Sequence, residues 1–88
     1  MISKNVILNN EVGLHARPAA VFVQTANKFS CNVYIEFNGK KVNGKSIIGV
    51  MSLGAFDGEE ITIIANGVDE KQAIEELIDL VENGLNDL

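Results

Sequence analysis

The sequence of 88 residues has no tryptophan, one proline, one cysteine and one histidine. A single cysteine, Cys31, cannot make a disulfide framework or a zinc site. Because Cys31 lies between Phe29 and Val33, we expect a partly buried and inert thiol. The single histidine has no cluster of carboxylates around it in the sequence, so neither a metal site nor a cofactor is expected.

Long apolar runs and an excess of positive charge are also missing. No run approaches the ~20 residues of a membrane-spanning helix, so no membrane insertion is expected. The first ten residues lack the apolar stretch of a signal peptide, and we therefore expect a cytoplasmic protein. Lysine and arginine number 7 against 12 acidic residues, and aromatic residues are 6%, which disfavours nucleic-acid binding. Most acids lie in residues 69–88, which indicates the solvated face of a C-terminal helix.

What remains is an ordinary globular composition, with 47% hydrophobic and 22% charged residues. At this length we expect one domain over residues 1–88. Enzyme folds that need a few hundred residues, such as dinucleotide-binding enzymes, are excluded.

Four segments have the pattern of β-strands: residues 3–8, 32–37, 40–43 and 61–65. In the second of these, Val33, Ile35 and Phe37 alternate with polar side chains. Asn38-Gly39 follows it directly and predicts a type I′ hairpin turn.

Three segments have helical spacing. Residues 16–28 carry an apolar stripe of Ala19, Phe22, Val23 and Ala26. Residues 47–53 follow Ser46 as N-cap and end at Gly54. The last helix starts at Asp69, and Gln72 three residues later predicts a capping box. The helix is expected to stop at Asn83-Gly84. Its buried stripe is expected to consist of Ile74, Leu77, Ile78 and Val81. The order βαββαβα predicts an α+β open-faced sandwich of two layers, in which three helices cover one face of a four-stranded antiparallel sheet.

The segment with the most chemistry is GLHARPAA, residues 13–20. Pro18 suits the first turn of a helix, which places His15 at or just before the helix start. Gly13 permits the bend that leads into it. The free N–H groups of Ala16 and Arg17 and the positive end of the helix dipole then favour an anion, and the Arg17 guanidinium suits phosphate oxygens.

A nucleophile, oriented donors and a cation at one point are what a transferring phosphoryl group requires. Imidazole is largely neutral at pH 7 and can attack phosphorus without a strong base beside it. On spacing alone, however, a histidine at a helix start is more often a simple cap, and an adjacent arginine is more often a surface cation, than parts of a phosphoryl-transfer site.

The whole octapeptide decides between these interpretations, because it closely resembles the active-site motif of the histidine-containing phosphocarrier protein (HPr) family of the sugar phosphotransferase system. The resemblance extends over the full chain in size and element order. It implies a carrier rather than an enzyme. His15 would accept a phosphoryl group from phospho-enzyme I and pass it to the A domains of the sugar permeases (enzyme II), with Arg17 and the Ala16 N–H holding the phosphate. A monomer is expected, since the carrier presents one face to several partners in turn.

A second segment, KSIIGVMSLG at residues 45–54, resembles the regulatory segment of the Gram-positive type of this family. The resemblance implies that HPr kinase/phosphorylase phosphorylates Ser46, and that the product binds catabolite control protein A in carbon catabolite repression. We expect Val50 and Leu53 to fill the core and the other side of this helix to be an apolar docking patch. The resemblance implies a docking surface made of Ala20, Gln24, Ile47, Ile48 and Met51.

Other functions stay open at this point. A regulation-only member of the family would lack the histidine that stands at position 15, and a carrier of a nitrogen-regulating branch is disfavoured by the Ser46 segment. An acyl-phosphate hydrolase of this size would need a base near His15, where only Glu11 is available. A passive interaction module is the remaining class. Gly44 and Ile48 depart from the usual family residues and bear on partner affinity, and the sugars served depend on the permeases.

Overall fold

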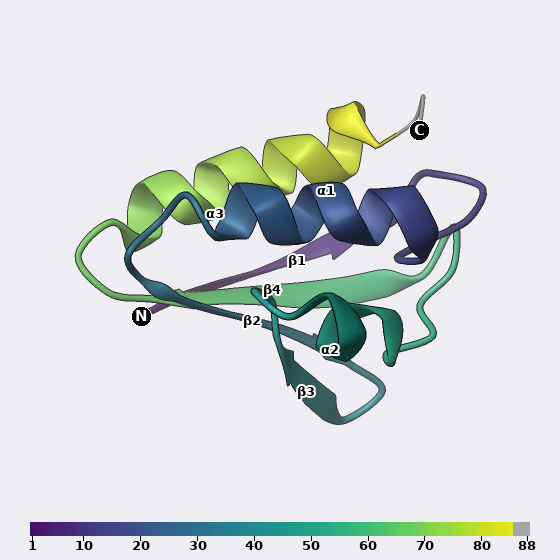
Figure 1. Ribbon diagram of the computed structural model, residues 1–88, viewed down its shortest axis with the longest axis horizontal. Coiled ribbons are helices and arrows are strands. Elements are labelled where there is room, and N and C mark those ends of the chain that lie inside the picture. The colour runs from purple at the N-terminus through teal and green to yellow at the C-terminus, as the bar shows by residue number, and fades with distance from the viewer. Residues whose placement is uncertain (86–88) are drawn as a thin grey trace.

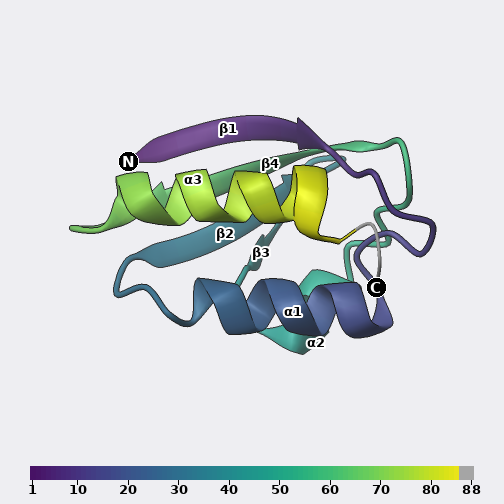
Figure 2. The same ribbon diagram turned by 90° about the horizontal axis from the view of Figure 1, so that it is seen from above.

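The computed structural model describes residues 1–85. Four antiparallel strands form one sheet in the order β1-β4-β2-β3, and the helices lie together on one face of it (Figures 1 and 2). This arrangement confirms the predicted βαββαβα order and the α+β class. The elements are β1 (Ile2–Ile7), α1 (Ala16–Ala26), β2 (Asn32–Phe37), β3 (Lys40–Asn43), α2 (Ile47–Met51), β4 (Glu60–Asn66) and α3 (Glu70–Asp79), which a π-helical turn η1 (Leu80–Gly84) extends.

The core lies between the sheet and the helices, as the alternating strand patterns predict. Ile63 pairs in register with Ile35, and Ala65 with Val33, so these four side chains share the covered face. Phe22 from α1 packs against this face and is fully buried. Asn38 and Gly39 have φ values of 52° and 78°, the positive pair that a type I′ turn requires.

Two details of the helices differ from the prediction. The buried face of α1 contains Pro18, whereas Val23 is only partly buried. Helix α1 ends at Ala26, two residues early, where the Asn27 side-chain amide donates to the Val23 carbonyl at 2.9 Å and to the Lys45 carbonyl at 3.3 Å. The bond to Lys45 ties the end of α1 to the loop before α2.

The predicted capping box at Asp69 is wrong. The Asp69 carboxylate makes no cap bond; it accepts instead from the backbone N–H groups of Ser30 at 2.8 Å and Cys31 at 2.9 Å. These bonds favour the ionised form and lower the pKa of Asp69. The neighbouring Glu70 instead makes a side-chain hydrogen bond at the start of the helix, where its Oε1 accepts from the Gly67 N–H at 3.0 Å.

The end of the last helix also differs, since η1 continues through Gly84 and that glycine has no positive φ. Asp87, assigned to the acidic helix face, lies outside the described residues. Within residues 1–85, no helix combines the length and the apolarity that crossing a bilayer demands.

Candidate functional site

His15 lies where the chain enters α1, as predicted. It is the N-cap residue, with extended φ and ψ of −137° and 158°, and it is exposed. Its side chain makes no cap hydrogen bond, so the imidazole is free of the structural role that an N-cap side chain usually has. The first N–H groups of α1 have no partner within the helix, and they belong to the residues that directly follow His15 in the chain.

The loop before His15 is fixed by contacts that the sequence did not reveal. The buried Asn10 side chain donates to the Gly13 carbonyl at 2.9 Å, and the Gly13 N–H donates to the Asn10 carbonyl at 3.1 Å. The Leu14 N–H then donates to the Ala55 carbonyl at 3.0 Å. No sequence pattern linked this loop to Ala55.

Gly13 is required at its position for two independent reasons. Its φ of +63° is a left-handed conformation that favours glycine. A Cβ atom there would also lie 2.2 Å from the Ala55 carbonyl oxygen. The backbone two residues before His15 therefore lies directly against the loop after α2.

Ala16 has a positive φ of 51°, which is uncommon for a residue with a side chain. This conformation costs an L-residue roughly 1–2 kcal/mol. Strain of this kind is found mainly at functional sites, where the surrounding structure maintains it. Here it sits between His15 and Arg17, and alanine's high helix propensity gave no sign of it.

Arg17 is exposed on the first turn of α1. Both ion pairs in the described residues involve other cations, the N-terminal ammonium with Glu70 and Lys28 with Glu76. Among the described residues the Arg17 guanidinium is thus in no ion pair, two residues after His15 in the chain.

Ser46 is the N-cap of α2, as predicted, and its Oγ accepts from the Gly49 N–H at 3.2 Å. Val50 and Leu53 are buried, while Ile47 and Ile48 are exposed to 38% and 78%. Met51 is of intermediate exposure and also packs against the core, so its place in the docking surface stays a prediction.

Helices α1 and α2 pack against each other, and α2 lies behind α1 in Figure 2. Hydrogen bonds at the two ends show that the segments run in opposite directions. The Lys45 carbonyl is bonded to Asn27 after the end of α1, whereas Ala55 is bonded to Leu14 before its start. Ser46 and His15 therefore lie toward opposite ends of one face. Helix α1 has 11 residues, and at ~1.5 Å per residue it is about 16 Å long. On α1, Ala20 is partly buried and Gln24 is exposed.

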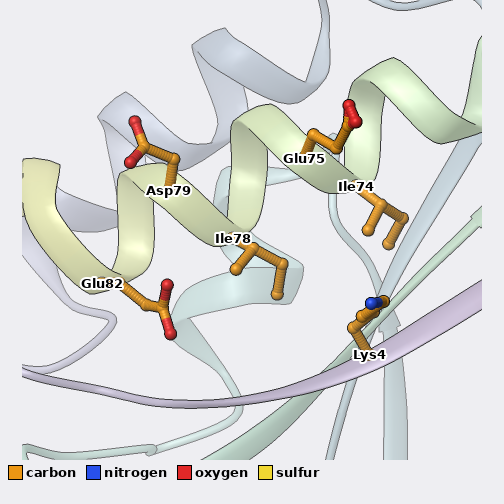
Figure 3. Close-up of a pocket in the computed structure, with 6 residues that line it drawn as sticks. All are labelled: Lys4, Ile74, Glu75, Ile78, Asp79 and Glu82. Carbon is orange, nitrogen blue, oxygen red and sulfur yellow. The ribbon is translucent and has the colours of Figure 1, made fainter.

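A groove of about 280 Å³ lies elsewhere, between α3 and the edge strand β1. In Figure 3 its two isoleucines, Ile74 and Ile78, point toward β1, with Lys4 on that strand. The groove contains none of the residues predicted for the site. Its lysine is on the edge of the sheet, where a charge hinders pairing with another strand.

Comparison with known proteins assigns the chain to a family. Residues 2–83 match the family model of the PTS HPr component phosphorylation site. The chain therefore belongs to the HPr family of phosphocarrier proteins. It is 50% identical over 82 residues to the HPr-like protein Crh of Bacillus subtilis, a match that covers 93% of this chain and 96% of Crh.

Solved structures agree with this assignment. HPr of Thermoanaerobacter tengcongensis matches with a TM-score of 0.93 at 49% identity, covering 97% of this chain and 96% of that one. Crh of Bacillus subtilis matches with a TM-score of 0.78 at 48% identity, covering 97% and 98%, and is described as a catabolite repression protein that forms a domain-swapped dimer. The family thus includes dimers, and the expected monomer stays a prediction.

Proposed function

We propose that this chain is a phosphocarrier of the sugar phosphotransferase system. It accepts a phosphoryl group from phospho-enzyme I on His15 and passes it to the A domains of enzyme II sugar permeases in the cytoplasm. The observation that supports this most is the exposed imidazole of His15, which occupies the N-cap of α1 without making a cap bond. A side chain committed to capping would be less available to a partner.

The transfer uses groups that converge at the start of α1. A ring nitrogen of neutral His15 attacks phosphorus, the P–N bond forms, and the bond to the donor breaks with its electron pair leaving on the donor. The N–H groups at the start of α1, that of Ala16 among them, and the Arg17 guanidinium offset the charge on the phosphoryl oxygens. The reverse sequence of bond changes delivers the group to the acceptor.

Regulation in this proposal acts through α2. HPr kinase/phosphorylase transfers a phosphoryl group to Ser46, and the phosphorylated form binds catabolite control protein A. Ser46 is partly exposed, and within residues 1–85 its hydroxyl accepts one hydrogen bond, from the Gly49 N–H. The exposed Ile47 and Ile48, with Gln24 on α1, form the main docking surface, to which Ala20 and Met51 contribute their accessible parts.

A second candidate is a purely regulatory role, and the identity of 50% to Crh favours it. Regulation-only members of the family lack the histidine, however, whereas this chain has His15 in an exposed position. A carrier of a nitrogen-regulating branch differs from the proposed function only in its partners.

The test is incubation with phosphoenolpyruvate and enzyme I. A carrier accumulates one acid-labile phosphoryl group per chain, and His15→Gln accumulates none. Both proteins should still acquire an acid-stable phosphoryl group from HPr kinase/phosphorylase and ATP, which shows that the variant is folded. Wild-type protein labelled by the kinase but never by enzyme I would overturn the carrier role and favour the regulatory one.

A further inference from the structure

Asn10 is a buried polar side chain in the loop before the candidate site. It is 6% exposed, and no other polar or charged side chain in the described residues is as deeply buried. Its Oδ1 accepts no hydrogen bond within residues 1–85, so only its amide N–H group is engaged. A leucine of similar volume would avoid burying an unpaired oxygen. Stability alone therefore does not explain an asparagine at this position.

The amide of Asn10 holds the loop that leads to His15. It donates to the Gly13 carbonyl at 2.9 Å, while the Gly13 N–H donates to the Asn10 carbonyl at 3.1 Å. These two bonds close residues 10–13 into a ring. The next residue, Leu14, is 1% exposed and donates its N–H to the Ala55 carbonyl at 3.0 Å. The backbone that enters His15 therefore has a fixed path.

The imidazole depends on this path for its position. His15 is exposed, and its side chain makes no cap hydrogen bond. Its place is then set by the backbone on either side, which is helix α1 after it and the loop of residues 10–14 before it. In-line attack on phosphorus requires the ring nitrogen at a defined distance and angle, and small displacements of a reacting group slow such a step strongly.

We propose that Asn10 is a positioning residue for phosphoryl transfer: its amide, through the Gly13 carbonyl, holds the backbone that aims His15 at phosphorus. This inference rests on the proposed carrier function. Because Asn10 is buried, it offers no surface to a partner, and the docking residues on α1 and α2 lie outside its loop. Its loss should therefore affect turnover of the bound complex rather than docking.

The experiment compares two variants with the wild type in steady-state labelling by phosphoenolpyruvate and enzyme I. Asn10→Asp keeps the shape and the side-chain oxygen but loses the N–H donor, and Asn10→Leu keeps only the volume. Both should lower kcat about tenfold, with an unchanged KM and an unchanged circular dichroism spectrum. The matched control is Asn9→Asp, which makes the same exchange at the exposed neighbouring residue and should have wild-type constants.

A reagent that needs no protein partner separates the position of the ring from its reactivity. Phosphoramidate phosphorylates imidazole directly: a P–N bond forms to the ring nitrogen, and the bond from phosphorus to the ammonium group of the reagent breaks as ammonia leaves. Such a small molecule can approach the exposed ring from many directions. Asn10→Leu and the wild type should therefore react with it at similar rates.

The proposal is overturned if Asn10→Leu has the wild-type kcat, if the change appears in KM alone, or if the rate with phosphoramidate falls as much as kcat. Wild-type protein that reacts with phosphoramidate but not with phospho-enzyme I would refute the carrier function instead. NMR relaxation of the His15 N–H then decides whether Asn10 holds this residue. Greater motion in Asn10→Leu than in Asn9→Asp supports the positioning role, and equal motion contradicts it.

Discussion

Phosphorylation of Ser46, or its substitute Ser46→Asp, should weaken docking of enzyme I without changing the reactivity of His15. The phosphate adds about −1.5 to −2 charges at pH 7. It sits at the Asn27 end of the α1–α2 face, whereas His15 sits at the Ala55 end. The length of α1, about 16 Å, approximates their separation.

The direct interaction between two phosphates at that distance is small. Two groups of charge −2 separated by 16 Å in water repel by about 1 kcal/mol, and a Debye length of ~8 Å reduces this to about 0.1 kcal/mol. The effect on the transfer step at His15 is then less than about twofold. A larger inhibition must arise where the partner covers Ser46.

At that surface the charge adjoins Ile47 and Ile48, which are exposed to 38% and 78%. An apolar partner surface must remove water from the new charge, and an acidic one repels it, at a cost of ~1.4 kcal/mol or more. We therefore expect the KM of enzyme I for Ser46→Asp to rise about tenfold or more, with kcat nearly unchanged. The circular dichroism spectrum should not change, because aspartate is also a good N-cap.

The matched control is Ser3→Asp, which adds the same charge on β1, at the opposite edge of the sheet from β3. It should leave KM unchanged at physiological salt. Steady-state labelling of His15 over a range of ionic strengths measures both constants. A lowered kcat with an unchanged KM would refute the docking explanation, and so would an equal effect of Ser3→Asp.

Three further outcomes follow from the geometry. Arg17→Ala should slow phosphoryl transfer ~10²–10³-fold, the usual effect of losing one oriented donor, and single-turnover labelling with equal rates would contradict the role of Arg17. Gly13→Ala should lower both thermal stability and labelling, because its Cβ would lie 2.2 Å from the Ala55 oxygen; an unchanged melting temperature would argue against that contact. The lowered pKa of Asp69 means that its carboxylate stabilises the fold above its ordinary pKa of 3.8, and that this stability is lost as the pH falls through the lower folded value. Thermal melts should therefore show that Asp69→Asn destabilises the protein at neutral pH and much less in strong acid, and a constant difference would refute the role of the two bonds that Asp69 accepts.

Most of the fold could be predicted because its signals are local and periodic. The alternation in residues 32–37 and 61–65 and the Asn38-Gly39 turn depend only on neighbours in the chain. The errors occurred where a side chain bonds to a distant segment. Asp69 resembles a helix cap, but the N–H groups of Ser30 and Cys31 compete for its carboxylate.

The candidate site also has some features that the sequence predicts and others that it does not. The positions of His15 at the helix start and of Ser46 as the cap of α2 follow from Pro18 and from ordinary capping preferences. The positive φ of Ala16 and the bond from Leu14 to Ala55 do not, since they arise only when two loops far apart in sequence meet. Helical spacing alone could not decide which side of α2 is covered, because a helix of five residues offers too few turns.

The antiparallel packing of α1 and α2 has a consequence for any dual control by His15 and Ser46. The two sites are too far apart for one phosphate to influence the other directly in salt, yet they share one face of the molecule. A partner that buries about 800 Å² of this protein, the typical size of a specific interface, would span a distance comparable to the length of α1 and cover both sites. A smaller partner centred on His15 would be indifferent to Ser46. Sensitivity to phosphorylation at Ser46 should therefore increase with how far a partner's footprint extends along α1 toward Asn27, and partners of the same protein should differ in that sensitivity.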